Sequence, residues 1–156
     1  MRSYADSSFI LRLITGEADS PQVIAEYRRL GTPRLYYLPL HALEVRNAIL
    51  QRAFHQRRSA AAGERAGIAR ERDVALARLE RLLARRALLD VALDPDAVVA
   101  RAIRLSAAHT ERIGARAIDL LHVAGALLLE SEQFLTADDR QSHLARAEGM
   151  KVGMVV

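Results

Sequence analysis

Four acidic residues stand far apart in the sequence, each next to a point where the backbone is expected to change direction. They are Asp6, Glu44, Asp119 and Asp138, and three of them lie at or near the junction of an expected strand with an expected helix. In an open α/β sheet such junctions line one crevice at the carboxyl ends of the strands. Carboxylates that converge there would bind a hard cation such as Mg²⁺ or Mn²⁺, which takes oxygen ligands and accompanies phosphate groups. The pattern predicts metal-assisted phosphodiester cleavage.

Each acid also has a purely structural interpretation. Asp6 and Asp138 stand where a carboxylate caps a helix, and Asp139 offers the same cap as Asp138. Glu44 and Asp119 are harder to explain in this way. Both are flanked by apolar residues, and a carboxylate in apolar surroundings is costly unless it is paired, hydrogen-bonded or bound to metal.

Three polar residues are expected to support the acids. Asn47 follows Glu44 by one helical turn, so it is expected to hold that carboxylate or a metal-bound water. Ser7 and Thr136 are expected to do the same for their neighbours. His122 follows Asp119 by three residues and could pair with it, but a lone helical histidine is more often a packed or surface residue. The prediction leaves His122 out of the chemistry.

The elements that position these residues alternate between short apolar strands and helices. Strands are expected at 3–5, 35–38, 88–93, 133–136 and 152–156. Helices fill the intervals, and those at 40–58 and 64–86 form an antiparallel hairpin around a break of small residues. This alternation predicts an α/β fold with a parallel sheet covered by helices on both faces, in one domain that spans residues 1–156.

Composition narrows the function classes. The chain of 156 residues is 51% hydrophobic and 27% charged, which indicates a globular domain. The absence of cysteine excludes a disulfide scaffold, a thiolate zinc site and a cysteine nucleophile, and agrees with a cytoplasmic protein. The most apolar run, 118–129, is interrupted by polar residues and is shorter than a membrane span, so no membrane association is expected.

The net charge of +4 comes almost entirely from arginine, which binds phosphate bidentately and attracts nucleic acid. Many of these arginines lie in the hairpin, where acidic residues interleave with them, so a plain solvated helical surface explains them as well. No Gly-rich phosphate loop and no Gly-x-Ser-x-Gly motif occurs, which disfavours an NTPase and an α/β-hydrolase.

Taken together, these contexts resemble a PIN-domain nuclease over essentially the whole chain. Asp-Ser-Ser follows the first strand, and Glu44 lies on the third helix with Asn47 one turn on. Asp-Leu-Leu-His-Val-Ala-Gly-Ala then opens a late helix, and Phe-Leu-Thr-Ala-Asp-Asp-Arg-Gln follows the fourth strand. These last two motifs are the most specific. In length and compactness the chain is similar to the VapC ribonuclease toxins of bacterial VapBC toxin–antitoxin pairs.

The resemblance implies a three-layer α/β/α sandwich and an endoribonuclease that depends on Mg²⁺ or Mn²⁺. It implies a site made of Asp6, Glu44, Asp119 and Asp138, an RNA substrate, a homodimer and an antitoxin that covers the cleft. The doublet of Asp138 and Asp139 leaves two candidates for the fourth acid, and the Thr-x-Asp pattern favours Asp138.

Two other functions remain open. A non-catalytic RNA-binding or partner-binding module could keep the same fold. A receiver-type signalling domain fits less well, because receivers pair two acids after the first strand and Asp6 has no acidic neighbour. If the four acids do converge, we also expect them to repel one another without metal, so that some stay protonated.

Overall fold

The computed structural model describes residues 2–154. Its strands are β1 (Ser3–Ala5), β2 (Leu35–Tyr37), β3 (Leu88–Asp90), β4 (Gln133–Thr136) and β5 (Lys151–Met154). Its helices are α1 (Ser7–Ile14), α2 (Ser20–Arg29), α3 (Pro39–Ser59), α4 (Arg65–Ala84), α5 (Pro95–Ile113), α6 (Ala117–Leu128) and α7 (Asp139–Ala147), with a 3₁₀ turn at Ala62–Glu64.

The five strands form one sheet in the order β3-β2-β1-β4-β5, and every neighbouring pair is parallel. Starting from β1, the strands β2 and β3 follow on one side, and β4 and β5 follow on the other side. The strand order therefore reverses between β1 and β4, where Tyr4 lies opposite Phe134. In open α/β sheets the crevice beyond the carboxyl ends of the strands at this reversal is the usual place for a ligand.

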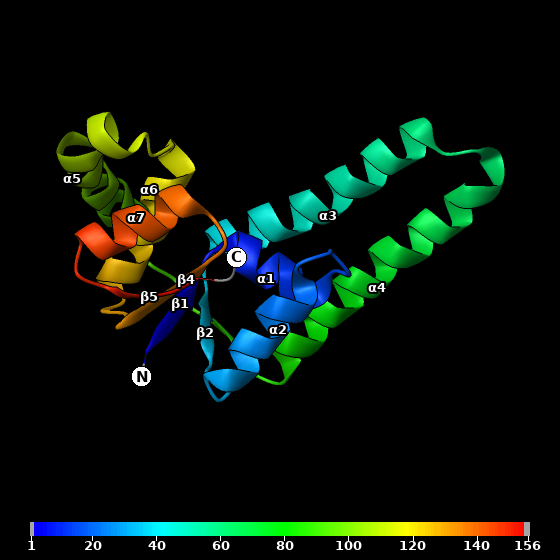
Figure 1. Ribbon diagram of the computed structural model, residues 1–156, viewed down its shortest axis with the longest axis horizontal. Coiled ribbons are helices and arrows are strands. Elements are labelled where there is room, and N and C mark those ends of the chain that lie inside the picture. The colour runs from blue at the N-terminus through cyan, green and yellow to red at the C-terminus, as the bar shows by residue number, and fades with distance from the viewer. Residues whose placement is uncertain (1, 155–156) are drawn as a thin grey trace.

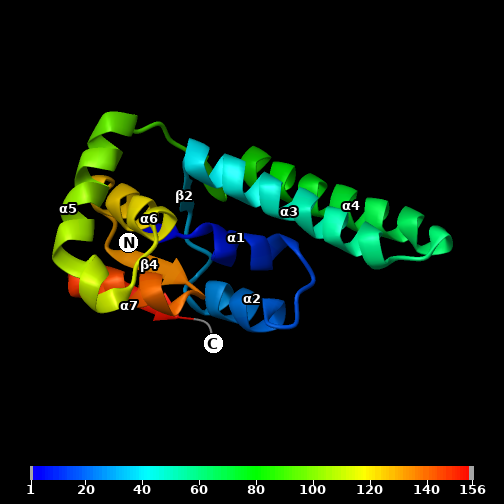
Figure 2. The same ribbon diagram turned by 90° about the horizontal axis from the view of Figure 1, so that it is seen from above.

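Helices cover both faces of the sheet, so the expected three-layer α/β/α sandwich is confirmed (Figures 1 and 2). Neighbouring residues of a strand point to opposite faces, and the buried residues accordingly separate into two clusters. Ala5 and Leu135 pack with α1 to α4, whereas Tyr4 and Phe134 pack with α5 to α7. Both clusters include residues of the central strands β1 and β4. Packing on both faces of the sheet therefore fixes the backbone near the carboxyl ends of these strands.

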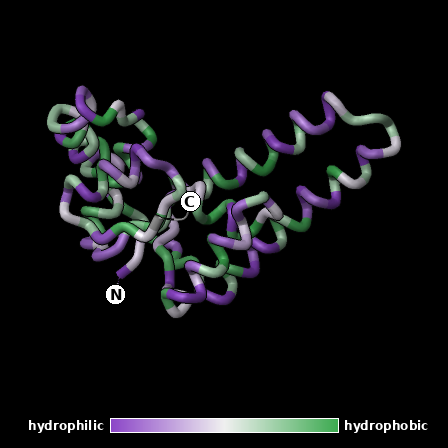
Figure 3. Tube along the Cα trace, viewed as in Figure 1, coloured by the Kyte–Doolittle hydropathy of each residue, from purple (hydrophilic) through white to green (hydrophobic). Residues whose placement is uncertain are grey.

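The hairpin of α3 and α4 extends well beyond the rest of the molecule (Figures 1 and 2). Near the sheet it is anchored by buried Val45, Ile49 and Leu79. Toward its distal loop the two helices present mixed hydrophilic and hydrophobic turns to solvent (Figure 3). Only the inner part of the hairpin therefore belongs to the core.

Most predicted elements are present, with shifts at their ends. β2 ends at Tyr37, one residue early, because Leu38 is already the N-cap of α3 and Pro39 occupies its first turn. β3 ends at Asp90 instead of residue 93. The last strand runs from Lys151 to Met154, and the predicted positions 155–156 lie outside the described residues. Within residues 2–154, none of the helices has both the length and the apolar character needed to cross a bilayer.

Candidate active site at the carboxyl ends of the strands

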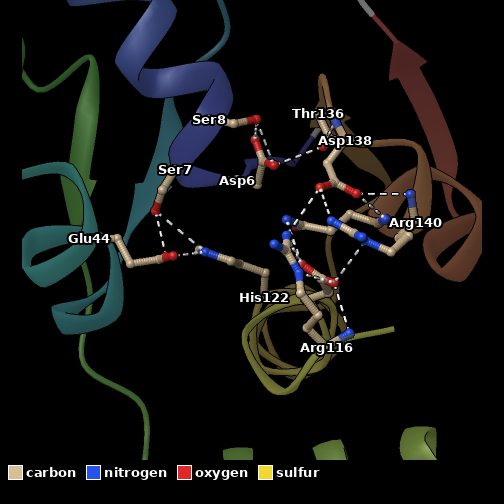
Figure 4. A network of polar contacts seen from close by, with 11 residues as sticks. Asp6, Ser7, Ser8, Glu44, Arg116, His122, Thr136, Asp138 and Arg140 are labelled. Atoms are coloured by element: carbon tan, nitrogen blue, oxygen red, sulfur yellow. Dashed lines mark hydrogen bonds and ion pairs between the residues drawn. The ribbon is translucent and has the colours of Figure 1, made fainter. Parts of the chain in front are cut away.

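The four predicted acids lie at the carboxyl ends of β1, β2 and β4 and the start of α6. Figure 4 shows Asp6, Glu44 and Asp138, and Arg116 links Asp138 to Asp119. Asp6 follows β1 directly, Asp138 follows β4, Glu44 lies in the second turn of α3 after β2, and Asp119 lies in the first turn of α6. The topology thus brings together residues from nearly opposite ends of the sequence.

Asp6 is fully buried and is held by neutral donors. Its carboxylate accepts hydrogen bonds from the Ser8 hydroxyl at 2.8 Å, from the Phe9 backbone N–H at 2.9 Å and from the Thr136 hydroxyl at 2.8 Å. The bond from Phe9 also makes Asp6 the N-cap of α1. No ion pair involves Asp6 among the described residues, and burial raises its pKa above the ordinary aspartate value even though these hydrogen bonds oppose the rise.

Glu44 is three-quarters buried and is held by Ser7 and His122. Its Oε2 accepts a hydrogen bond from the Ser7 hydroxyl at 2.8 Å and lies 2.5 Å from Nε2 of His122. Burial by itself raises the pKa of Glu44, but the hydrogen bonds from His122 and Ser7 outweigh it, so the pKa is lowered overall. Glu44 is therefore kept as a carboxylate.

Asp119 is fully buried, and its carboxylate interacts with the side chains of two arginines. Its oxygens accept bonds from the backbone N–H of Arg116 at 2.9 Å and from the Arg116 guanidinium at 3.2 Å. Nε of Arg140 lies 3.5 Å from the same carboxylate, and the Gln141 amide donates to it at 3.4 Å. The expected pairing of Asp119 with His122 is not present, since His122 bonds to Glu44 instead.

Asp138 shares both arginines with Asp119. Its Oδ2 accepts from the guanidinium groups of Arg116 and Arg140, each at 3.2 Å, while its Oδ1 caps α7 by accepting from the Arg140 N–H at 2.8 Å. Thr136 links Asp138 to the first acid, because its hydroxyl accepts from the Asp138 N–H and donates to the Asp6 carboxylate. Asp139 is exposed and takes part in no hydrogen bond or ion pair among the described residues, so the geometry favours Asp138 as the fourth acid.

Two expectations about the environment of the acids are wrong. Asn47 does not hold the Glu44 carboxylate: it is exposed on α3, and its side chain forms no hydrogen bond among the described residues, so its expected role toward a metal-bound water stays a prediction. Mutual repulsion does not govern Asp119 and Asp138, because Arg116 and Arg140 compensate their charge.

The sequence prediction also missed the three basic side chains that complete the network. Arg116 and His122 each stand three positions from Asp119, one turn away on either side, and Arg140 stands two positions after Asp138. That spacing is the signal that was available. Nothing in the spacing says that His122 reaches across to α3, because that contact depends on how α6 packs against β1 and α3.

Arg116 and Arg140 compensate part of the charge of the four carboxylates, through ion pairs with Asp119 and Asp138. The donor atoms of the network are carboxylate and hydroxyl oxygens, the kind that Mg²⁺ and Mn²⁺ prefer. Yet no three His, Asp or Glu side chains within residues 2–154 are arranged so that they could hold one ion together. The set therefore fits a hard divalent cation in the chemistry of its oxygens, while its carboxylates are engaged by arginines and hydroxyls.

Two solved structures share this fold. One is the structure of FitAB bound to an IR36 DNA fragment, which matches with a TM-score of 0.64 and 18% identity over 97% of this chain and 94% of that one. The other is FitAcB from Neisseria gonorrhoeae, with a TM-score of 0.62 and 18% identity over 96% and 95% of the two chains. At 18% identity these matches show a shared fold, and this chain has the α/β sandwich of the PIN fold. No protein-family model and no curated protein matches the sequence.

Proposed function

We propose that this protein is a divalent-metal-dependent endoribonuclease and the toxin of a toxin–antitoxin pair. The observation that carries the proposal is the network of Asp6, Glu44, Asp119 and Asp138, drawn from four separate segments to the crevice where the strand order reverses. The likeness of the whole chain to a PIN-domain toxin supports the same class of function.

Mg²⁺ or Mn²⁺ is the cofactor that the donor set suits, and the four acids would hold it. When bound, the ion would supply a water of lowered pKa and would stabilise negative charge on the phosphate. Asp6 supports this assignment, because it is a fully buried carboxylate that is held by hydroxyl and backbone N–H donors and has no ion pair among the described residues. Asp119 and Asp138 would each have to exchange an arginine for the ion.

Arg116 and Arg140 are the cations available for the substrate. Both guanidinium groups are partly exposed at the rim of the network, and a guanidinium matches the oxygens of a phosphodiester bidentately. Once released from the aspartates, they would bind and orient the RNA backbone beside the reacting phosphate. Glu44 stays a carboxylate through its hydrogen bonds, so it remains ready to accept a proton or to hold the ion.

A groove on the hairpin side suits the antitoxin partner. It has a volume of about 400 Å³ and lies between the end of α1 and the helices α3 and α4. Apolar side chains such as Ile49 and Val74 line it together with Arg52, Arg70 and Arg78. An amphipathic antitoxin segment with apolar anchors and acidic flanks would complement this mixture.

A homodimer is the second partner that we propose. Leu43, Leu50 and Phe54 are exposed on α3 at spacings of seven and four residues, which places them along one side of the helix. Exposed apolar side chains of this size in a row favour an interface over a solvated surface.

The test of the function is RNA cleavage by the purified protein with and without metal. We expect cleavage with Mg²⁺ or Mn²⁺ and none after addition of EDTA. Asp119→Ala should lower the rate by on the order of a thousandfold, or about 4 kcal/mol of transition-state stabilisation. Asp139→Ala is the matched control, because it removes a neighbouring exposed carboxylate outside the network, and it should retain the parent rate.

The alternative is a non-catalytic RNA-binding or partner-binding module with the same fold. RNA binding without cleavage under any metal condition would favour it. Cleavage that persists in EDTA or in Asp119→Ala would instead contradict the metal mechanism.

A further inference from the structure

Behind the Glu44 carboxylate lies a continuous chain of hydrogen-bonding side chains from three elements. The Tyr4 hydroxyl of β1 is 3.0 Å from Nδ1 of His122 in α6, and Nε2 of His122 is 2.5 Å from Oε2 of Glu44 in α3. Tyr4 is fully buried and His122 is 1% exposed, whereas Glu44 is 27% exposed. The chain therefore leads from the core to the surface of the site.

Chemistry assigns the direction of each hydrogen bond. A carboxylate only accepts, so Nε2 of His122 carries the hydrogen that faces Glu44. When the ring of His122 is neutral with its hydrogen on Nε2, Nδ1 is an acceptor, and the Tyr4 hydroxyl 3.0 Å away donates to it. Tyr4 thus donates to His122, and His122 donates to Glu44.

The surroundings hold both donor rings in place. The Tyr4 ring stacks on Phe134 at 5.5 Å and contacts His41 at 5.0 Å, while the rings of His41 and His122 are 4.9 Å apart. His41 is fixed in turn, because its two nitrogens bond to the Leu38 N–H and the Ala5 carbonyl. Neither Tyr4 nor His122 can change rotamer without displacing buried neighbours.

Glu44 has no such confinement of its own. Its side chain is 27% exposed, and its other hydrogen-bond partner is the hydroxyl of Ser7. The charges of Arg116 and Arg140 lie on the far side of the network with Asp119 and Asp138, and the structure gives neither of them an ion pair to Glu44 (Figure 4). The orientation of the Glu44 carboxylate therefore depends on His122 and Ser7.

We propose that His122, held by Tyr4, is a positioning residue that fixes the Glu44 carboxylate in the active site. The inference rests on the proposed function for what Glu44 acts upon, a divalent ion and an RNA phosphate, but the hydrogen-bonded chain can be tested without either. Outer residues that orient a ligating or catalytic carboxylate typically change metal affinity or activity about tenfold to a hundredfold when they are replaced.

The decisive comparison is between His122→Leu and His122→Gln. Leucine fills the space without a donor, whereas the amide of glutamine can place an N–H near the original Nε2. Tyr4→Phe is a third variant, which keeps the stacked ring and removes only the donor to Nδ1. All three are measured for Mn²⁺ affinity by calorimetry, for kcat and KM on RNA, and for thermal stability.

We expect His122→Leu to weaken Mn²⁺ binding and lower kcat by about tenfold to a hundredfold with little change in KM, and His122→Gln to recover part of both losses. Tyr4→Phe should show a smaller loss in the same direction. A role in packing alone predicts the opposite ranking, because buried leucine is tolerated better than a buried amide. Equal Mn²⁺ affinity and kcat in the Leu and Gln variants and the parent would overturn the inference and leave the proposed function standing.

Nuclear magnetic resonance separates the inference from the proposed function. In the parent, the Nε2 hydrogen of His122 should exchange slowly with water, and Glu44→Ala should abolish that protection. If the parent neither binds Mn²⁺ nor cleaves RNA, the proposed function fails, and this signal still decides whether His122 holds Glu44. Rapid exchange of that hydrogen in the parent would refute the positioning role whatever the activity.

Discussion

At the level of single residues, the two fully buried acids of the site differ in how their charge is compensated. Asp6 is surrounded by the neutral donors Ser8, Phe9 N–H and Thr136, whereas Asp119 is hydrogen-bonded to Arg116 and forms an ion pair with Arg140. Replacing each by its uncharged amide should therefore affect stability in different ways.

Asp119→Asn should destabilise the metal-free protein by about 1–3 kcal/mol, because it removes charge-assisted hydrogen bonds and leaves Arg140 facing a neutral group. Asp6→Asn should cost less or stabilise, because it removes a buried charge that has no counter-ion while hydroxyl partners can reorient. Urea denaturation in EDTA measures both. An equal loss in the two variants would show that charge compensation does not distinguish the sites.

The raised pKa of Asp6 also predicts a pH dependence. The folded protein binds the Asp6 proton more tightly than the unfolded chain does, so this group contributes stability at low pH, and that contribution is lost as the pH rises through the folded pKa. The parent should therefore lose stability relative to Asp6→Asn as the pH rises above the ordinary aspartate range in EDTA. Denaturation curves of the two proteins over a pH series give the difference, and a constant difference would contradict the shift.

The sequence predicted the acids but not their partners, for a physical reason. Asp6 and Asp138 follow apolar strands, and the topology of parallel sheets brings such positions together whatever the side-chain detail. His122 and Arg116 could not be assigned in this way, because a helical side chain one turn away can face a neighbour on its own helix or reach another element. Asn47 shows the limit: its spacing to Glu44 is right, yet it faces solvent.

At the level of elements, two helical glycines meet different surroundings. Gly67 in α4 has open space where a Cβ would stand, whereas a Cβ at Gly125 in α6 would lie 3.0 Å from Leu38 Cδ1 and 3.4 Å from the Tyr4 hydroxyl. Gly67→Ala should stabilise the protein by about 0.5–1 kcal/mol through helix propensity. Gly125→Ala should gain less or destabilise, because Leu38 and Tyr4 must shift. Thermal unfolding of the pair tests this contrast, and equal gains would refute it.

The hairpin makes a second prediction at this level. Arg57, Arg58 and Arg65 are exposed near its distal loop, and if they track RNA phosphates, changing them to Gln should weaken RNA binding. The salt dependence of binding should flatten by about 0.7 for each phosphate that the protein no longer neutralises. The rate of cleavage of bound RNA should stay nearly unchanged. Arg28→Gln and Arg104→Gln remove exposed charges on α2 and α5 and serve as controls. An unchanged salt slope in the hairpin variants would show that these arginines are solvated side chains that do not contact RNA phosphates.

Element types were easier to predict than element ends. The apolar runs of β1, β2 and β4 and the long amphipathic helices of the hairpin all appear in the structure. The observed ends differ from the predicted ones where a helix cap shortens a strand, as Leu38 does after β2. Helix caps depend on local hydrogen bonding, which the spacing of apolar residues does not reveal.

At the level of the whole molecule, metal binding should be visible as global stability. A ligand at about a hundred times its Kd stabilises by about 2.7 kcal/mol, so saturating Mn²⁺ should raise the Tm of the parent measurably. Asp119→Asn should remove that gain. In Arg116→Gln the rise in Tm should occur at a lower Mn²⁺ concentration than in the parent, because the Arg116 guanidinium competes with the ion for Asp119 and Asp138. A Tm that does not respond to Mn²⁺ in the parent would contradict the metal site.

The central position of β1 has a consequence for the order in which the site can form during translation. β1 is synthesised well before β4, although the two strands are neighbours in the sheet, where Tyr4 lies opposite Phe134. Protein synthesis adds about 5–20 residues per second, so Asp6 and Glu44 wait on the order of ten seconds for Asp119 and Asp138. From the synthesis of Glu44 until that of Asp119, the nascent chain therefore holds only two of the four acids of the site. If RNA cleavage is confirmed, the new enzyme could act only after the segment that carries Asp119 and Asp138 has been translated.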